Sequence, residues 1–543
     1  MRRIQMEEKE VLTQEEVKES TPEEKKTLGQ VVSDAFHELG ETFVAFVKAP
    51  KALWGINVPY IIEGLVYFGI LTILGKYCSE NVQLTDPQAG WVYSFVTGGI
   101  TFAMLILGGV SDKIGVRRSL ILAFFVMLLG RTLVGLSGTI PLGHGITSPM
   151  FFTMIGGLTL MVLGYGLYQP ASYAGVKRYT NPQTAAMGYA VIYGLMNLGA
   201  FFSGFISPLT RHHFESVFPP NGLTAVFWVY ALLTLLSLAI TVFILTKKTD
   251  QSAVEQIARE TAEMNESGEE ENEEEEKPKE KINNWPLYGL TLLAVLFTGL
   301  LIGIKTGKID FNLPVTIILL SVTVIVGVWE FLRHRPDHPF RDVRFVFFIF
   351  ILIPVQTLFA HNWLTLPYYL DRAFHGSVVS QYFELFSNIN PILIFVLAPI
   401  VAGLTAKANI YRMMIIGTLV MASPTFLLAF GPNVVLFLSY ILIMSIGEAM
   451  WQPRFLQWIA EIAPKGKTGA YMGIGQLPWF LTKVLTGLYS GYFVATYIPK
   501  PETGQPIHSG TLWFIYGLIA ITSPVALWLA KNWMQKGMRE KAA

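Results

Sequence analysis

Five ionisable side chains lie well inside long apolar stretches of this chain: Glu63, Arg131, Glu448, Arg454 and Lys483. An ionised side chain at mid-membrane depth costs about 2.5–3.5 kcal/mol on insertion scales, so each one requires a partner or a water-filled cavity. A carboxyl group in such a place can take up a proton on one side of a membrane and release it on the other. Glu63 and Glu448 are therefore the candidates for proton coupling.

Each of these residues also has a structural interpretation. Glu448 could be paired permanently with Lys483, and Glu63 with a neighbouring donor. Arg454 and Glu461 lie seven residues apart on one helical face and could pair with each other or with the inner gate. The sequence leaves both interpretations open.

Uncharged residues in the same stretches could contact a solute. His361, Asn197 and Asn388 could hydrogen-bond to it, and the histidine is the side chain that titrates nearest to neutral pH. The same side chains could instead join helices, at well under about 2 kcal/mol each. Aromatic residues such as Tyr67 and Trp479 could form the wall of an apolar pocket, or could mark the membrane interface.

The composition identifies the solvent of these stretches as lipid. Of 543 residues, 52% are hydrophobic and only 15% are charged, whereas a soluble chain carries about a quarter charged residues. The net charge of +1 points to no nucleic-acid partner. A single cysteine, Cys78, excludes an internal disulfide and a cysteine-based zinc site.

Fourteen segments are long and apolar enough to cross a bilayer, which requires about 20 residues. They lie near 54–77, 90–111, 119–137, 150–174, 186–208, 223–246, 286–304, 312–332, 343–369, 383–404, 410–430, 434–462, 469–495 and 510–530. An even number places both termini on one side. The connections on that side hold most of the Lys and Arg residues, which predicts that it is cytoplasmic. The opposite side holds only Lys76, Arg211, Lys305, Lys308, Arg372 and Lys500.

These segments divide the chain. Two six-helix units are expected at 53–248 and 335–532, with a two-helix membrane insert at 285–334. Residues 249–284, which include "EEENEEEEKPKEK", are expected to form an acidic disordered linker, because like charges repel. The cytoplasmic tail at 1–52 contains apolar residues at helical spacing, which predict an amphipathic helix on the inner leaflet or against the protein's own loops. Residues 533–543 form the other tail.

The connection Gly108–Leu120, "GGVSDKIGVRRSL", resembles the loop between helices 2 and 3 of the major facilitator superfamily. The resemblance implies an all-α membrane protein of two six-helix bundles that works by alternating access. It also implies that Asp112, Arg117 and Arg118 take part in gating; the alternative is that they only set the topology. Arg131 falls on an outer helix of this fold, which favours a structural role.

Other stretches resemble the proton-dependent oligopeptide transporters, prokaryotic members of which also carry a two-helix insert. The matching stretches are "IYGLMNLGAF" (Ile192–Phe201), "NINPILIFVLAPIVAGL" (Asn388–Leu404) and "GEAMWQPRFLQWIAEIAP" (Gly447–Pro464). The resemblance implies that Glu448 and Glu63 line the central path from opposite halves. It further implies that Glu448 could hold the amino group of a solute.

Two motifs depart from that family. Its helix-1 pattern E-x-x-E-R-F-x-Y-Y-G appears here as "YIIEGLVYFG", so Glu63 and Tyr67 remain while Gly64 replaces the arginine. Its helix-4 pattern G-T-G-G-I-K-P appears as "GYGLYQP", with Gln169 in place of the lysine. Gln169 is then a candidate for solute binding, and Lys483 could bind a carboxylate in place of the missing lysine.

The chain is therefore expected to be a secondary active transporter of a small polar or zwitterionic solute, peptide-like or derived from amino acids, driven by protons without a cofactor. Its partners would be the solute and the lipid bilayer of a bacterial inner membrane, with the oligomeric state left open and a monomer compatible with the sequence. The alternatives are an uncoupled or exporting carrier of organic anions or amphiphiles, and a non-transporting receptor or assembly partner. No nucleotide-binding G-x-x-x-x-G-K-[ST] loop or hydrolase motif is present, so no enzyme activity is expected.

Overall fold

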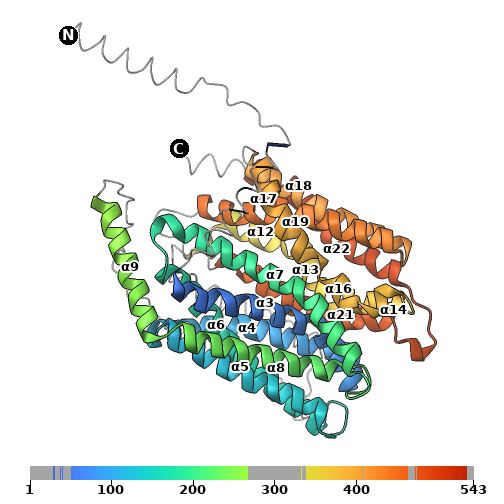
Figure 1. Cartoon of the computed structure of the whole chain (residues 1–543). Coiled ribbons are helices and arrows are strands. Elements are labelled where there is room, and N and C mark those ends of the chain that lie inside the picture. The colour runs from blue at the N-terminus through green and yellow to red at the C-terminus, as the bar shows by residue number, and fades with distance from the viewer. Residues whose placement is uncertain are drawn as a thin grey trace.

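The computed structural model describes residues 50–266 and 338–534, apart from 406–407, 463–470 and 472–473, together with a few isolated positions outside these ranges. Its first half is a bundle of six long helices, coloured from blue to green in Figure 1. They are α3 (Lys51–Lys76), α4 (Asp86–Ile114), α5 (Val116–Thr139), α6 (Pro149–Arg178), α7 (Pro182–Phe214) and α8 (Leu223–Ile244). A short π-helix, η1 (Tyr77–Asn81), continues α3.

The second half contains six further transmembrane passes, three of which are interrupted. The first consists of α12 (Val343–Ile351), α13 (Ile353–Leu364) and α14 (Leu366–Ala373); the second of α16 (Phe383–Ser387) and α17 (Ile389–Leu404), preceded by the short α15 (Val378–Gln381). The third is α18 (Ile410–Ala422) with the 3-10 helix η3 (Ser423–Phe430); α19 (Val434–Ile462), α21 (Leu477–Tyr497) and α22 (Ser509–Leu529) follow. Prolines begin α13 and α14, where a missing backbone N–H is tolerated.

Ten helical segments of the described chain are long and apolar enough to cross a membrane. α4 and α21 complete two sets of six. The all-helical two-bundle fold is therefore confirmed. The two extra segments expected at 285–334 lie outside the described residues, so the count of fourteen stays a prediction.

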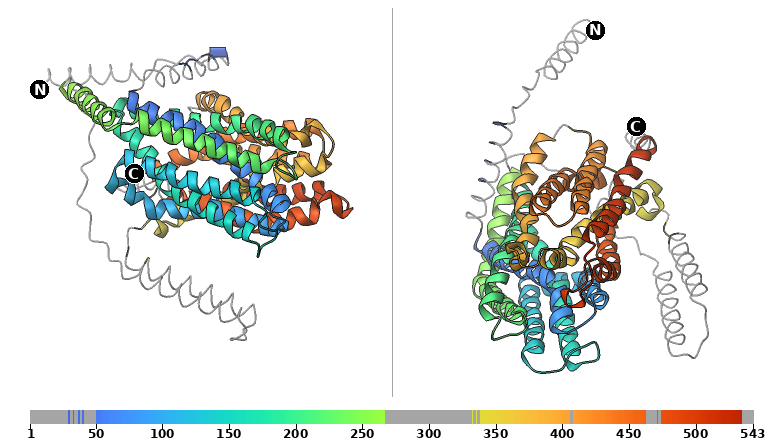
Figure 2. Two further views of the ribbon diagram at one scale, coloured as in Figure 1. Left: turned by 60° about the horizontal axis from the view of Figure 1, so that its bottom comes forward. Right: turned by 90° about the vertical axis from the view of Figure 1, so that its right-hand side faces the viewer.

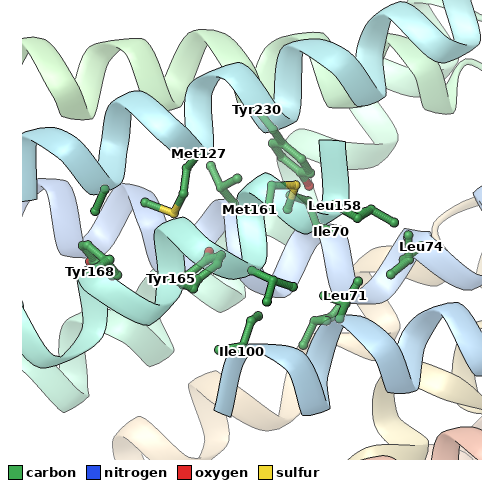
Figure 3. Close-up of a cluster of buried hydrophobic side chains, with 14 of the residues drawn as sticks. Ile70, Leu71, Leu74, Ile100, Met127, Leu158, Met161, Tyr165, Tyr168 and Tyr230 are labelled. Carbon is green, nitrogen blue, oxygen red and sulfur yellow. The ribbon is translucent and has the colours of Figure 1, made fainter. Parts of the chain in front are cut away.

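Each half has its own hydrophobic core. The first core joins α3 to α8 and also takes in Ala360 and Leu364 of α13, and the second joins the helices from α12 to α22. In Figure 2 the red α21 lies beside the blue α4, where the two halves meet. Figure 3 shows part of the first core, where Leu71, Met161 and Tyr165 pack between neighbouring helices.

The halves meet closely where α4 lies against α21. A methyl group added to Gly90 would stand 2.4 Å from the carbonyl oxygen of Gly487, so no larger residue fits there. Ser94 donates a hydrogen bond to the carbonyl oxygen of Val484 at 2.9 Å. Helix α3 also contacts α13, and α7 contacts α17, so together with α4 and α21 three pairs of contacting helices join the halves around the space between them.

The expected disordered linker is helical over its first part. α9 (Lys247–Glu266) projects beyond the bundle and begins directly after α8 (Figure 1). Asp250 accepts hydrogen bonds from Arg178 and Tyr179 at 3.0 and 2.7 Å, and Ala253 is buried. The expectation of disorder overlooked these local contacts with the end of α6. The rest of the linker and the two tails fall outside the described residues, except for isolated positions and their inner ends.

The predicted loop Gly108–Leu120 is a one-residue turn. Helix α4 continues to Ile114 and α5 begins at Val116, with Gly115 between them at a φ of +82°. Glycine adopts this left-handed conformation without steric cost. The two helices therefore form a tight hairpin.

Candidate functional site

A cavity of about 440 Å³ lies between the two halves. This volume is within the range of small-molecule sites. Helices α3, α4, α6 and α7 line it from the first half, and α13, α17, α19 and α21 line it from the second. Its polar and charged lining residues are Tyr67, Tyr93, Thr101, Tyr165, Gln169, Tyr193, Asn197, Gln356, Asn390, Glu448, Gln452, Gln476, Thr482 and Lys483.

Five of the seven residues predicted to bind solute line this cavity: Tyr67, Gln169, Asn197, Glu448 and Lys483. They come from both halves, so the structure brings together residues that are up to several hundred positions apart in sequence. Their arrangement around one space is compatible with a shared role in binding.

Glu448 is the acidic residue of the cavity and is 5% exposed. Its Oε2 atom accepts a hydrogen bond from Asn390 Nδ2 at 2.8 Å, and the same amide nitrogen donates to Ser445. Within the described chain no cation lies within ion-pair distance of this carboxyl group. The alternative of a permanent Glu448–Lys483 pair is therefore absent from this conformation.

Lys483 is the basic residue of the cavity, and it is half-buried on α21. Its neighbour Thr482 donates a hydrogen bond to Gln356 Oε1 at 3.2 Å. The Nε2 atom of Gln356 is buried and has no hydrogen-bond partner in the described part of the protein. Sequence analysis did not single out Gln356, although a glutamine within the ninth apolar segment, at 343–369, was a usable signal.

Glu63 does not line the cavity. It is 1% exposed and forms a two-point ion pair with the fully buried Arg131 of α5, with one N–O distance of 2.9 Å. Tyr165 donates a hydrogen bond to Glu63 and accepts one from Arg131 at 3.1 Å, and Thr234 accepts another from Arg131. These contacts favour the structural interpretation for both residues, because Glu63 and Arg131 are each other's partners in one cluster inside the first bundle. Tyr165 is the member of this cluster that also reaches the cavity.

The arginine missing from the helix-1 motif has a physical explanation. A methyl group on Gly64 would stand 2.8 Å from the carbonyl oxygen of Met196 on α7, so this position accommodates no side chain. Arg131 instead supplies a guanidinium to Glu63 from another helix. The charge pair is retained while its cation comes from a different part of the sequence.

Gln169 and Asn197 are partly engaged within the first half. Gln169 donates a hydrogen bond to the Tyr60 hydroxyl at 2.9 Å, and Asn197 donates to the carbonyl oxygen of Tyr193 at 3.0 Å. Both amides keep acceptor oxygens for a solute. The first half therefore presents uncharged polar groups to the cavity.

The other two predicted binding residues lie outside the cavity lining. His361 is fully buried, contacts Thr365 and Tyr489 at 2.8 and 3.0 Å, and stacks on Tyr516 with ring centroids 3.7 Å apart. Asn388 donates hydrogen bonds to Thr72 and to the backbone at the break between α16 and α17. These contacts favour the packing interpretation for both residues.

Aromatic side chains form much of the remaining wall. Trp363 and Trp479 line the cavity together with Tyr67, whereas Tyr168 and Trp451 are buried behind it. The Trp363 ring contacts Phe68, another lining residue, at 5.1 Å between centroids. The solute therefore meets an aromatic surface as well as two charges.

At the end of the bundle where α3 finishes, buried ion pairs join the halves. Arg372 of α14 pairs with Asp86 of α4 at 2.8 Å, and Lys76 pairs with Asp371. We call this group, with the pair formed by Arg211 of α7 and Glu384 of α16 at 2.8 Å, the Lys76-end seal.

The seal also bears on the predicted topology. Lys500, which donates to the carbonyl oxygen of Ser79 at 2.9 Å, joins Lys76, Arg211 and Arg372 at this end. All four were assigned to the side poor in basic residues. Sequence analysis counted them only as loop charges and did not foresee that Lys76, Arg211 and Arg372 would pair with acidic residues of the other half.

The opposite end is more open. Tyr193, in the first part of α7, lines the cavity and is nevertheless 50% exposed. Near the far end of the same helix, Arg211 is held in the seal. The cavity is thus reached from the end where α7 begins.

The predicted gating residues lie at that open end. Arg117 donates a hydrogen bond to the carbonyl oxygen of Leu245 at 2.7 Å, which ties α5 to the end of α8 within the first half. Arg118 is exposed, and the side chain of Asp112 lies outside the described residues. Arg454 donates hydrogen bonds to the side-chain oxygen of Gln457 and to the carbonyl oxygen of Thr405. The side chain of Glu461, its proposed partner, is likewise not described.

Known proteins share this architecture. A sequence model of the Major Facilitator Superfamily matches residues 59–476. The dipeptide and tripeptide permease B of Xenorhabdus bovienii is 22% identical over 527 residues, covering 91% of this chain and 97% of that protein. The dipeptide and tripeptide permease A of Escherichia coli is 22% identical and covers 88% of this chain and 90% of its own length.

Solved structures agree on the fold. A crystal structure of the peptide transporter POT in complex with sulfate superimposes with a TM-score of 0.63 at 18% identity, covering 90% of this chain and 96% of that one. A POT family transporter in complex with 5-aminolevulinic acid gives 0.62 at 18% identity, covering 89% and 97%. With its two bundles, central cavity and matching sequence model, this chain belongs to the Major Facilitator Superfamily, as a divergent member that resembles the proton-dependent oligopeptide transporters.

Proposed function

We propose that this protein is a proton-coupled secondary transporter of a peptide-like or amino-acid-derived solute, with Glu448 as the group that carries the proton. The relatives named as dipeptide and tripeptide permeases support the solute class. The cavity supports it chemically, because one carboxylate, one ammonium and an aromatic wall suit a small amphiphile with polar ends.

One observation carries the choice of Glu448. The described chain contains four buried carboxylates: Glu63, Asp86, Glu384 and Glu448. The first three each form an ion pair with an arginine: Glu63 with Arg131, Asp86 with Arg372, and Glu384 with Arg211. An ion pair of this kind holds a carboxylate in its charged form, whereas a carboxyl group without a cation can change its protonation state at lower cost.

Glu63 therefore has a different role in this proposal. Its ion pair with Arg131 stabilises the first bundle and holds the Tyr165 ring against Tyr67, with 5.1 Å between ring centroids. Both rings face the cavity, so the pair shapes the binding surface without exchanging protons.

The direction of access follows from charge distribution. The positive-inside rule places the open end in the cytoplasm and the Lys76-end seal at the periplasm of a bacterial inner membrane, with both termini cytoplasmic. The conformation described is then inward-facing. Transport would require the seal to open while the halves close at the other end, around a site at the membrane midplane. The proton gradient would supply the energy without a cofactor.

The test is proton movement into proteoliposomes that contain purified protein and a pH-sensitive dye. Dipeptides, tripeptides, amino acids and organic anions are added to the parent, to Glu448→Gln and to Glu502→Gln, an exposed carboxylate used as control. We expect solute-dependent acidification that only Glu448→Gln abolishes.

Other outcomes would select the alternatives. Exchange of labelled solute without proton movement would identify an uncoupled carrier. Folded protein that responds to no compound would favour an exporter of another solute or a non-transporting membrane protein.

A further inference from the structure

The two charges of the cavity both belong to the second half. Glu448 lies on α19 and Lys483 on α21, while the first half contributes uncharged residues such as Tyr67, Gln169 and Asn197. The lining is therefore neutral when Glu448 is ionised and carries one positive charge when Glu448 is protonated. The net charge of the cavity lining, zero or +1, therefore depends on a single proton.

Among the described residues, no group around Glu448 offsets the change in charge that follows when this carboxyl group takes up a proton. Helix α17 presents Asn390 to it, α18 packs Met421 against the backbone of Gly447, and α7 contributes the uncharged Tyr193 to the lining of the same cavity. Lys483 of α21 is the other charged group that faces the same space.

One carboxyl group cannot hold a transported proton and the ammonium group of a solute at the same time. Both neutralise the same negative charge, so they compete for Glu448. The other buried carboxylates of the described chain are already paired with arginines and offer no second position for an ammonium group. A solute that travels together with the proton must then bind without an ammonium group at Glu448.

A carboxylate has a prepared position in the same cavity. Lys483 forms no ion pair within the described chain, and an ammonium group favours a charge-assisted hydrogen bond to a carboxylate. The buried Nε2 group of Gln356 points to the same partner, because it lacks an acceptor and its other end is held by Thr482, next to Lys483. Lys483 and the Nε2 group of Gln356 are therefore two hydrogen-bond donors available to the same carboxylate.

We propose that the protonated protein selects a monoanion: an amphiphile with a carboxylate and no free amino group, such as an N-acylated amino acid or dipeptide. Lys483 and Gln356 hold its carboxylate, Glu448 carries the proton, and Trp363 and Trp479 contact its apolar part. One proton and one monoanion cross together without net charge. This inference rests on the proposed function, since it requires proton coupling at Glu448.

The experiment compares N-acetyl-phenylalanyl-alanine with phenylalanyl-alanine, which differ only in the acetyl group. Binding to purified protein is measured by calorimetry at pH 5.5 and 7.5. We expect the parent to bind the acetylated dipeptide more tightly at the lower pH. Glu448→Gln, which mimics the protonated carboxyl group, should bind it equally at both.

Lys483→Met should weaken this binding about tenfold or more, which corresponds to about 1.4 kcal/mol. Lys483→Arg should retain it and so exclude misfolding as the cause, and Gln356→Leu should weaken it as well. Lys51→Met, at the exposed start of α3, is the control for loss of a positive charge.

Proton influx in proteoliposomes separates the two proposals. Influx with the acetylated dipeptide, unchanged by an imposed membrane potential, is the expected result. Influx with phenylalanyl-alanine alone would overturn this inference and leave the proposed function intact. Influx with neither dipeptide nor any other solute would overturn the proposed function, and this inference with it.

Discussion

The Glu63–Arg131 pair allows a quantitative test of the distinction between structural and proton-carrying charges. Replacement of Arg131 by Met removes both guanidinium contacts and leaves the Glu63 carboxylate buried, with Tyr165 as its remaining donor. Removal of one partner of a buried ion pair costs about 3–5 kcal/mol of stability. Glu63→Gln should cost a similar amount, because it leaves the guanidinium without its counter-charge.

The double variant Glu63→Gln/Arg131→Met should be far more stable than the sum of the single variants predicts. Replacement of a whole buried pair by groups of similar volume is often close to neutral. Because the two single costs sum to about 6–10 kcal/mol, a double variant close to neutral implies a coupling free energy of about that size, above the range of about 0.5–3 kcal/mol that is usual for residues in direct contact. Tyr165→Phe should cost about 1–3 kcal/mol, because it removes a hydrogen bond to a charged group.

The assay is equilibrium unfolding of the purified protein in mixed micelles, with the four members of the cycle measured under identical conditions. Effects that add to within about 0.5 kcal/mol would show that Glu63 and Arg131 do not form the pair described here, and would refute the reasoning. Proton uptake by the double variant supplies the functional half of the test. If a stable double variant lost solute-driven proton uptake, Glu63 would carry protons after all.

Three further predictions concern the seal, the helix-1 motif and the buried histidine. Arg372→Ala should break the contact with Asp86 and raise the rate of maleimide labelling at Cys78, the buried single cysteine of η1, about tenfold, which corresponds to about 1.4 kcal/mol less free energy to expose the thiol. Arg118→Ala at the other end should leave this rate unchanged, and equal rates in the two variants would contradict the seal. Gly64→Ala should destabilise the protein by about 1–3 kcal/mol by overpacking against Met196, while Gly156→Ala, which has open space around it, should lower the unfolding temperature little or not at all. His361→Ala should lower the unfolding temperature and leave solute affinity within about twofold, because His361 packs on Tyr516 outside the cavity; a tenfold loss of affinity with unchanged stability would argue for direct binding.

The sequence determined the solvent, the fold class and the superfamily. Lipid requires each crossing segment to be helical and apolar over a fixed length, so these properties are local and can be counted from residue types. The expense of a charge in lipid likewise identified Glu63, Arg131, Glu448 and Lys483 as residues that require a physical explanation. Short motifs around Gly108, Asn388 and Gly447 then indicated the superfamily.

Only the tertiary structure decided which of these charged side chains form ion pairs with one another. Glu63 and Arg131 are far apart in sequence, and their pairing depends on how α3 packs against α5. The same packing places Glu448 and Lys483 in one cavity without joining them, and excludes His361 and Asn388 from its lining. The sequence could name a carboxylate in the membrane, but only the fold could show that Glu63 has a cation and Glu448 does not.

The same limit applies to the ends of the bundle. Lys76, Asp86, Arg372 and Glu384 are separate loop or helix-end charges in the sequence, and become a seal only when the halves meet at that end. Hydrophobic periodicity is a property of one segment, whereas an ion pair between halves is a property of their relative position. The sequence therefore determined the elements and their solvent, and the tertiary structure determined the partners from which a function can be proposed.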